Sequence, residues 1–344
     1  MVNLSKQYER ATHAERDGQY IKFSYKKFDS DKFKGNQRKG FVFFKKNDGT
    51  LTKQFVKLDE ISRATKGQFK SNFDYQYASV SEDMSSIFLR SLVNNDSNFT
   101  SVDNYQFEMF EIENRLVSGV LVDDYVQLGH LEMILTHKIQ DEPYNQYLVN
   151  YNEFIKNVAT CTVSKIVLKS LIQFFVRYGV NFDQAKHFLV QQAGFDMLLG
   201  NIDRKENSGN FVFIANDQQV IPINFDYGRM LQITWTDKTE MKFSNGKFSS
   251  EDIKEITLDY VESIIGMRGG IINSTNREEN IQFLLDNGFQ PFKINLEILQ
   301  EKLSLHVDKI EHLKPEIKHF VRMKARVLLQ LLRDKRVSQL VEVV

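Results

Sequence analysis

The stretch DMLLGNIDRKENSGNFVFIANDQQVIPINFDYG, residues 196–228, predicts a polar loop followed by a short β-hairpin. A helical pattern ends at Gly200, and the runs FVFI and VIPINF predict two strands joined by the turn ANDQQ. Asp203 and Asp226 then lie at the two open ends of this hairpin. Because antiparallel pairing brings such ends close together, we expect both carboxylates and the amide of Asn210 to converge on one point.

These three side chains suggest a magnesium site. Mg²⁺ binds one or two carboxylates together with phosphate oxygens and water, so the residue types indicate phosphoryl transfer. In protein kinases a catalytic-loop Asp orients the attacking hydroxyl, a later Asn holds metal, and an Asp beyond a hairpin holds metal against the phosphates. The sequence therefore predicts Asp203 as catalytic residue, Asn210 and Asp226 as metal ligands, and ATP and Mg²⁺ as cofactors.

The N-terminal third contains strand patterns on both sides of one helical pattern. Residues 41–58 predict a hairpin, and residues 105–111 and 116–122 predict a second one. Between them, residues 79–93 place apolar side chains at helical spacing, with Ser79 or Ser81 as the N-cap.

A kinase also needs a strand lysine that holds the α and β phosphates and a helix glutamate that orients it. Lys57, in the apolar alternation of KQFVKLDE, is the candidate lysine, and Glu82 on the following helix is its partner. Lys53 and Asp83 are weaker alternatives. We expect Lys57 and Glu82 to line one cleft together with the residues of the hairpin.

The second half of the chain is mainly helical in pattern. From about residue 150 the hydrophobic period changes to 3.6, and further helical patterns cover residues 249–265, 277–288 and 314–340, the last with Pro315 in its first turn. A β-rich part with one helix followed by a larger helical part predicts an α+β fold. We expect two lobes: an N-lobe of β-sheet plus helix at 1–125, which holds the nucleotide phosphates, and a helical C-lobe at 126–344 with the catalytic loop and metal-binding hairpin.

The segments GFDMLLGNIDRKENSGNF and VIPINFDYGRML resemble the catalytic segment of HipA-like serine/threonine kinases. That family's pattern is roughly F-D-x-L-I-G-N-x-D-R-H-x-x-N-x-G, followed by a strand that leads to P-x-F-D-x-G. The likeness is best over residues 194–230 and extends weakly back to residues 81–92 and forward into the helical tail. It implies a two-lobed protein-kinase-like fold.

The chain departs from this pattern at two positions. Lys205 stands where the family has His, and a Lys at this place occurs in eukaryotic-type protein kinases, so Lys205 is expected to contact phosphate during catalysis. Ser208 occupies the position of the family's metal-binding Asn, and Asn210 matches only if two residues are inserted. Asn207 is the competing ligand; Asn210 is favoured because it directly precedes the strand.

The resemblance also suggests where the nucleotide binds. VDDY, residues 122–125, resembles a hinge whose backbone groups would bind adenine, so Asp123 and Asp124 join the predicted cofactor-binding residues. No G-x-G-x-x-G precedes Lys57, and HipA-like proteins lack it as well. Residues 63–72, rich in basic and backbone-permissive residues, are the candidate for a phosphate-covering loop.

Composition and simple sequence patterns argue against a nucleic-acid-binding, secreted, membrane-spanning or zinc-binding protein. Lys plus Arg and Asp plus Glu are each 45, so the net charge of zero gives no electrostatic case for binding nucleic acid. The charged N-terminus lacks the apolar core of a Sec signal, and no apolar run is long enough to span a membrane, so a cytoplasmic protein is expected. The single Cys161 fits a reducing compartment, and no H-x-x-x-H pair suggests zinc.

Together these features predict an ATP-dependent serine/threonine protein kinase that phosphorylates a hydroxyl of a protein substrate and also itself. The alternatives are a nucleotide-binding pseudokinase that acts as an interaction module and a phosphoinositide-kinase-like lipid or small-molecule kinase. HipA-like kinases include toxin components and translocated bacterial kinases. The resemblance therefore implies a bacterial enzyme, with an antitoxin or a host protein as partner, that acts in the cytoplasm or in a host cell.

Overall fold

The computed structural model describes residues 12–24, 37–45, 49–61, 77–93, 99, 101, 104–123, 132–135, 161, 163–177, 179–201, 211–215, 220–231, 248–265, 271–310 and 315–344. The chain divides into two compact units. Unit 1 comprises Met1–Ser86 and Asn104–Leu131, and unit 2 comprises Ile87–Asp103 and Glu132–Val344. The first unit is a β-barrel with a helix, and the second is mainly helical.

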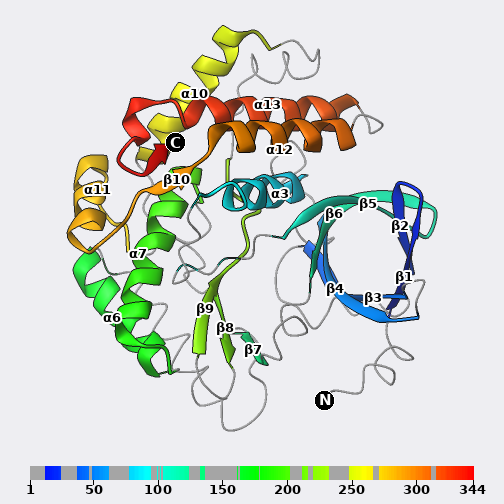
Figure 1. Cartoon of the computed structure of the whole chain (residues 1–344), viewed down its shortest axis with the longest axis horizontal. Helices are drawn as coiled ribbons and strands as arrows, with labels where there is room; N and C mark the ends of the chain where they lie inside the picture. Colours follow the sequence, from blue (N-terminus) through cyan, green and yellow to red (C-terminus); the bar gives the residue numbers. More distant parts are fainter. Residues whose placement is uncertain are drawn as a thin grey trace. The chain divides into compact units, whose positions relative to one another are not determined.

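Six strands form the barrel of unit 1: β1 (Thr12–Asp17), β2 (Tyr20–Phe23), β3 (Gln37–Lys45), β4 (Leu51–Ile61), β5 (Gln106–Ile112) and β6 (Arg115–Asp123). Their order around the closed barrel is β1-β2-β5-β6-β4-β3 (Figure 1). The β3–β4 and β5–β6 pairs are antiparallel hairpins, as predicted. The turn between β5 and β6 consists of Glu113 and Asn114, both with positive φ, which is the geometry that matches the twist of a two-residue hairpin.

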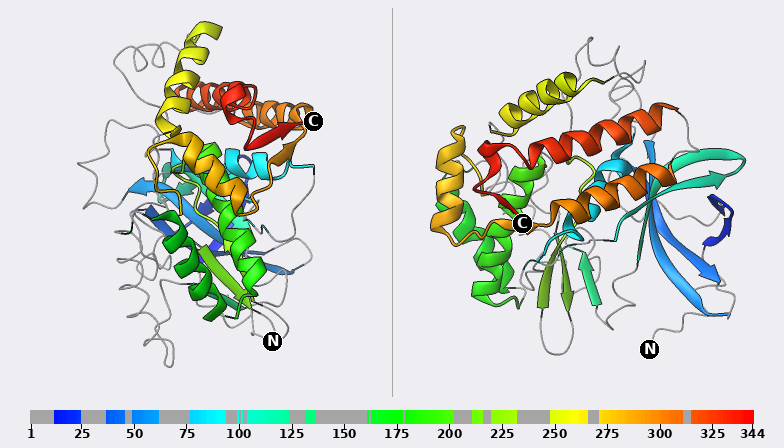
Figure 2. Two further views of the ribbon diagram at one scale, coloured as in Figure 1. Left: turned by 90° about the vertical axis from the view of Figure 1, so that its left-hand side faces the viewer. Right: turned by 45° about the horizontal axis from the view of Figure 1, so that its top comes forward.

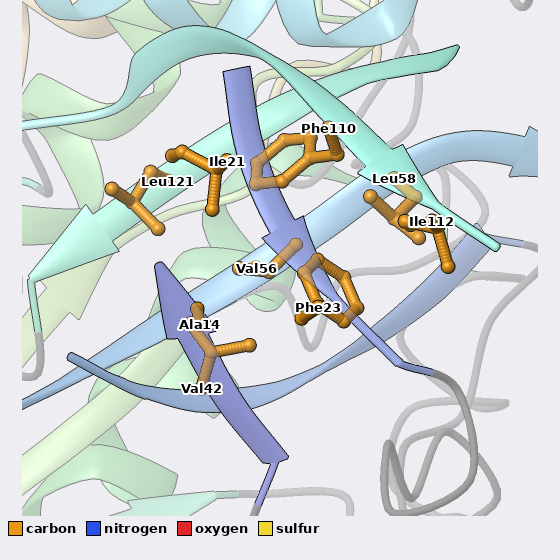
Figure 3. Packing of buried hydrophobic residues seen from close by; sticks show 9 residues of the cluster. All are labelled: Ala14, Ile21, Phe23, Val42, Val56, Leu58, Phe110, Ile112 and Leu121. Atoms are coloured by element: carbon orange, nitrogen blue, oxygen red, sulfur yellow. The ribbon is translucent and has the colours of Figure 1, made fainter. Parts of the chain in front are cut away.

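Apolar side chains from all six strands fill the barrel, as Figure 3 shows; they are Ala14, Ile21, Phe23, Val42, Val56, Leu58, Phe110, Ile112 and Leu121. Successive side chains of a strand point to opposite faces. Because Val56 and Leu58 are buried in this core, Lys57 and Asp59 face the outside of the barrel. Gly119 on β6 has no room for a side chain, since an added Cβ would lie 2.5 Å from the carbonyl oxygen of Lys57.

The predicted two-lobed, protein-kinase-like architecture is wrong. The fold is α+β, as expected, but residues 12–123 contain a closed six-stranded barrel. The error comes from residues 12–23, whose charged sequence predicts no strand. They form β1 and β2, which pair in parallel with β3 and β5 and so close the sheet. Tertiary pairing here overrides weak intrinsic strand propensity.

Helix α3 (Ala78–Leu89) follows β4 and confirms the predicted helix. It begins at Ala78, so Ser79 and Ser81 lie within it, and the prediction that one of them is the N-cap is wrong. The boundary between the two units falls within this helix, after Ser86.

Unit 2 contains the helices α6 (Ser164–Arg177), α7 (Phe182–Leu199), α10 (Ser250–Ile265), α11 (Arg277–Asp286), α12 (Leu296–Lys309) and α13 (Pro315–Leu331), and a 3₁₀ turn, η2 (Lys335–Val337). Helix α7 contacts α6, α10 and α11, while α13 contacts α10 and α12. Figures 1 and 2 show α12 and α13 running back along each other. Pro315 opens α13 as predicted, whereas no specific prediction covered α12.

Two small sheets accompany these helices. Strands β7 (Glu132–Leu135), β8 (Phe211–Ala215) and β9 (Val220–Asn224) form an antiparallel sheet, and β10 (Phe292–Ile294) pairs in parallel with β11 (Val341–Val343). The β8–β9 pair is the predicted hairpin, and α7 contacts β9.

Aromatic rings form much of the core of unit 2. The ring of Phe195 on α7 lies 5.9 Å between centroids from those of Phe88, Phe99 and Phe292, and 5.6 Å from that of Tyr227. Edge and tilted contacts of this kind are favourable beyond the burial of apolar area. They fix the C-terminal end of α7, which precedes Asp203 in the sequence by four residues.

Candidate functional site

Lys57 and Glu82, predicted to be partners, form a direct ion pair. Lys57 projects from the outer face of β4, and Glu82 projects from α3, which packs there. The whole residues are 7% and 1% exposed, so the pair is almost completely removed from water. A buried pair of this kind contributes little net stability, but removal of one partner strands the other charge in a low-dielectric environment.

Asp59, two residues after Lys57, is a second buried charge at the same contact. Its carboxylate accepts hydrogen bonds from the backbone N–H of Ser79 at 3.0 Å, from the Ser79 hydroxyl, and from the Ser118 hydroxyl at 2.6 Å. Burial raises the pKa of Asp59 to about 6, although the bonds from Ser118 and Ser79 and the charge of Lys57 act in the opposite direction. Sequence reasoning missed this residue.

The weaker alternatives lie nearby. Lys53 also faces outward on β4, and its ammonium lies 3.8 Å from the ring centroid of Phe41. Asp83 is buried on α3, next in sequence to Glu82. The structure thus pairs the favoured lysine with the favoured glutamate, while their role in nucleotide binding stays a prediction.

Of the two predicted hinge residues, Asp123 is the last residue of β6. Its carboxylate accepts a hydrogen bond of 2.6 Å from the Gln54 side chain on β4, which holds it beside the neighbouring strand. Asp124 lies outside the described residues, as does the predicted phosphate-covering loop at 63–72.

In unit 2, Asp226 follows the predicted hairpin. Phe211 at the start of β8 pairs with Asn224 at the end of β9, and Asp226 comes two residues later. It is partly buried and has a φ of 65°, in the left-handed region that non-glycine residues seldom adopt. Such strain persists only where the surroundings impose it, and it concentrates at functional sites.

A buried hydrogen-bond network holds the backbone next to Asp226. Asn224 is fully buried, and its side-chain oxygen accepts a bond of 3.0 Å from Gln192 on α7. The hydroxyl of the buried Tyr227 donates to the carbonyl of Asn224 at 2.8 Å, and the N–H of Leu231 donates to the carbonyl of Leu199 at 2.7 Å. The segment on both sides of Asp226 is therefore tied to α7.

The other predicted catalytic and metal-binding residues, Asp203, Lys205 and Asn210, lie outside the described residues, as does the competitor Asn207. The described residues directly before them are well anchored: the Asn201 side chain donates to Asp196 at 3.2 Å, and Gly200 ends α7 with a φ of 66°. Within the described ranges, no group of three or more His, Cys, Asp or Glu side chains is arranged to hold a metal ion. Of the predicted metal ligands, only Asp226 can be placed.

A pocket of about 400 Å³ lies elsewhere in unit 2. It is lined by Phe248 and by residues of α12 and α13, including Leu303, Arg322 and Arg326. Its lining contains none of the predicted site residues, so the predicted chemistry gives it no role.

The helices in the described part of the chain include none with the length and apolar character needed to cross a membrane.

Comparison of the chain with protein-family models, curated proteins and solved structures finds no match.

Proposed function

We propose that this chain binds Mg-ATP and transfers its γ-phosphoryl group to a Ser or Thr hydroxyl of a protein, as a kinase of HipA-like type. The observation that carries the proposal is the buried Lys57–Glu82 pair. Kinases hold the α and β phosphates with a strand lysine that a helix glutamate orients. Since a buried ion pair is poor support for stability, a functional reason for retaining it has more weight.

Each residue has a distinct role in this proposal. Lys57 supplies a positive charge to the nucleotide phosphates, and Glu82 orients its ammonium group. Asp226 would hold Mg²⁺, assisted by Asn210; when bound, the ion neutralises charge on the phosphates. Asp203 would align the attacking hydroxyl and Lys205 would contact phosphate. Catalysis then rests on positioning and electrostatics and needs no covalent intermediate.

The strained backbone at Asp226 supports the same conclusion independently. The neighbours that are tied to α7 hold the backbone of Asp226 at a φ of 65°, so the Cα–Cβ bond that carries the carboxylate has a set direction before any ligand binds. Preorganised ligands of this kind lose little freedom when they bind a cation. The proposal rests on these residues and not on the fold, since the closed barrel differs from the architecture that the resemblance implied.

The experiment is transfer of labelled γ-phosphate from ATP in the presence of Mg²⁺, with three acceptors: the chain itself, a generic basic protein, and vesicles that contain phosphoinositide. We expect label in the chain and in the basic protein, on Ser or Thr. Asp203→Ala and Asp226→Ala should lose this incorporation while circular dichroism shows that they remain folded. Removal of Mg²⁺ with a chelator should have the same effect.

The acceptors separate the alternatives. Label in lipid alone would replace the proposal with a phosphoinositide-kinase-like activity. ATP binding without transfer to any acceptor would support the pseudokinase. If the wild type neither binds nor transfers, the phosphotransferase proposal is wrong.

A further inference from the structure

Helix α3 is tied to strand β4 by two polar contacts. Lys57 and Asp59 are two residues apart on the strand and so share its outer face, while Ser79 and Glu82 are three apart on the helix and so share one helical face. Lys57 bonds to Glu82, and Asp59 bonds to Ser79. The two contacts form successive cross-links between the same strand and the same helix.

The Asp59 cross-link acts at the start of the helix. The N–H groups of a first turn have no partner within the helix, and α3 begins at Ala78, so the N–H of Ser79 is one of them. Asp59 satisfies it from the neighbouring strand, at the helix end where a negative charge is favoured. Because Asp59 also accepts from Ser118 on β6, it joins β4, β6 and α3 in one buried cluster.

Two cross-links fix both the rotation of α3 about its axis and its position along that axis, which one cross-link cannot do. A helix held by a single side-chain contact can rotate about that contact and slide along its axis. A shift by one residue turns the helix by roughly 100° and moves it by about 1.5 Å, which would carry Glu82 away from Lys57. A second contact one turn earlier opposes both movements, together with the packing of the buried side chains of α3.

We propose that Asp59 is a positioning residue, which sets the rotation and height of α3 so that Glu82 meets Lys57. Its part in phosphate binding rests on the proposed function, because it acts there only through the lysine. Nothing in this role brings Asp59 into contact with the nucleotide. The serines of α3 provide matched variants: the Ser79 hydroxyl donates to Asp59, whereas the Ser85 hydroxyl donates to the carbonyl of Ser81 within the helix.

The test measures exposure of the Lys57 amine directly. The full-length chain is treated with a limiting amount of a lysine-acylating reagent, and modification of Lys57 is followed by mass spectrometry, with Lys22 as an internal reference on the barrel. We expect Asp59→Ala and Ser79→Ala to increase the Lys57 acylation rate about tenfold, the equivalent of one lost hydrogen bond to a charged group. Ser85→Ala should leave the rate within about twofold of the wild type.

A double-mutant cycle separates positioning from general loosening. Once Glu82→Gln has removed the charge that holds Lys57, Ser79→Ala, which leaves the Asp59 charge in place, should add little further acylation, because both changes act through the same contact. Additive effects would indicate a merely structural role and overturn the proposal, as would equal rates for Ser79→Ala and Ser85→Ala. If Asp59→Ala fails to fold, Ser79→Ala still decides the question.

The same variants are then titrated with Mg-ATP. If Asp59 positions Lys57 for phosphate, Ser79→Ala should weaken ATP binding and Ser85→Ala should not. If the wild type binds no ATP, the proposed function fails, while the acylation rates still decide whether Asp59 positions the pair. If ATP binds but Ser79→Ala and Ser85→Ala match the wild type in both measurements, the function stands and the positioning role is wrong.

Discussion

Lys57 on β4 and Glu82 on α3 form an ion pair whose side chains are only 9% and 1% exposed. The residues are 25 positions apart in the chain and belong to different elements, so the pair depends on how the helix packs against the barrel. An exposed pair on the same barrel, Arg16 with Glu108, provides a natural comparison because its side chains are 49% and 17% exposed.

Removal of one partner of the buried pair should be costly. We expect Lys57→Met and Glu82→Gln each to lower the free energy of unfolding by about 3–5 kcal/mol, because the remaining charge is buried without its partner. The double variant Lys57→Met/Glu82→Leu should recover most of this loss, since apolar side chains of similar size fill the same space. Urea unfolding followed by circular dichroism measures all three.

The matched control for this prediction is Arg16→Ala, which breaks the exposed pair and should cost less than about 1 kcal/mol. If the single and double variants of the buried pair are equally destabilised, packing and not charge dominates this contact. The interpretation of the pair as a buried, mutually dependent unit would then be wrong.

Asp59 should give the stability of the protein a characteristic pH dependence. Burial raises its pKa to about 6 from an ordinary value of 3.8, so between these values the folded state binds more protons than the unfolded state. Stability therefore falls as the pH rises from about 4 to about 6, and the contribution of this one group amounts to roughly 3 kcal/mol.

Asp59→Asn removes this titration and isolates it. The wild type should lose stability relative to Asp59→Asn as the pH rises through the window from about 4 to about 6, and the difference should be constant above pH 7. Urea unfolding of both proteins at a series of pH values measures it. A wild type that gains relative stability over the same window would show that the pKa of Asp59 is lowered.

Because Asp226 has a positive φ, we expect its glycine and alanine variants to be equally inactive but to differ in stability. Asp226→Gly and Asp226→Ala both remove the carboxylate, so both should lose phosphoryl transfer. Glycine adopts a φ of 65° without a steric penalty and alanine does not, so Asp226→Gly should be more stable than Asp226→Ala by about 1 kcal/mol. Equal melting temperatures for the two variants would mean that the backbone is relaxed at this position.

Replacing Gly194 on α7 with alanine should lower the stability of the protein, although this substitution usually stabilises a helix. Alanine normally favours a helix over glycine by about 1 kcal/mol. At this position an added Cβ would lie 2.0 Å from Cε2 of Phe289, a buried ring packed against Phe292. We therefore expect Gly194→Ala to destabilise the protein by about 1–3 kcal/mol in thermal unfolding. Phe289→Leu in the same chain should reduce that loss, and additive losses would argue against the clash.

The sequence predicts the hairpins and several helices because their signals are local. Asn47-Asp48-Gly49 marks the β3–β4 connection, and apolar spacing marks α3. Closure of the barrel has no local signal, because Tyr20 pairs with Met109 and His13 pairs with Phe43 through long-range contacts. Those pairings join residues that lie far apart in the sequence, and no short window of sequence contains that information.

In the candidate site, too, residues with a local sequence signal could be predicted and residues that act through long-range contacts could not. Lys57 and Glu82 are predictable from residue type and periodicity. Asp59 carries a weaker signal, since the spacing Lys57-x-Asp59 places both charges on one strand face. Gln192 lies within a continuous helical pattern and carries no signal for its hydrogen bond to Asn224. Residues that position others are recognised by their contacts, and contacts between distant elements appear only in the folded chain.

The most direct test of the central claim, that Lys57 held by Glu82 binds nucleotide phosphate, is calorimetric titration of Mg-ATP into three proteins: the wild type, Lys57→Met and Lys22→Met. Lys22 is the matched control because it lies on the barrel strand β2 in ion pairs of 2.7 Å with Asp17 and 3.1 Å with Glu111. We predict that Lys57→Met raises the dissociation constant for Mg-ATP about tenfold or more, as expected for a lost charge-assisted bond, while Lys22→Met binds Mg-ATP with the affinity of the wild type. Equal affinities for the wild type and Lys57→Met, or no binding to the wild type, would contradict the claim.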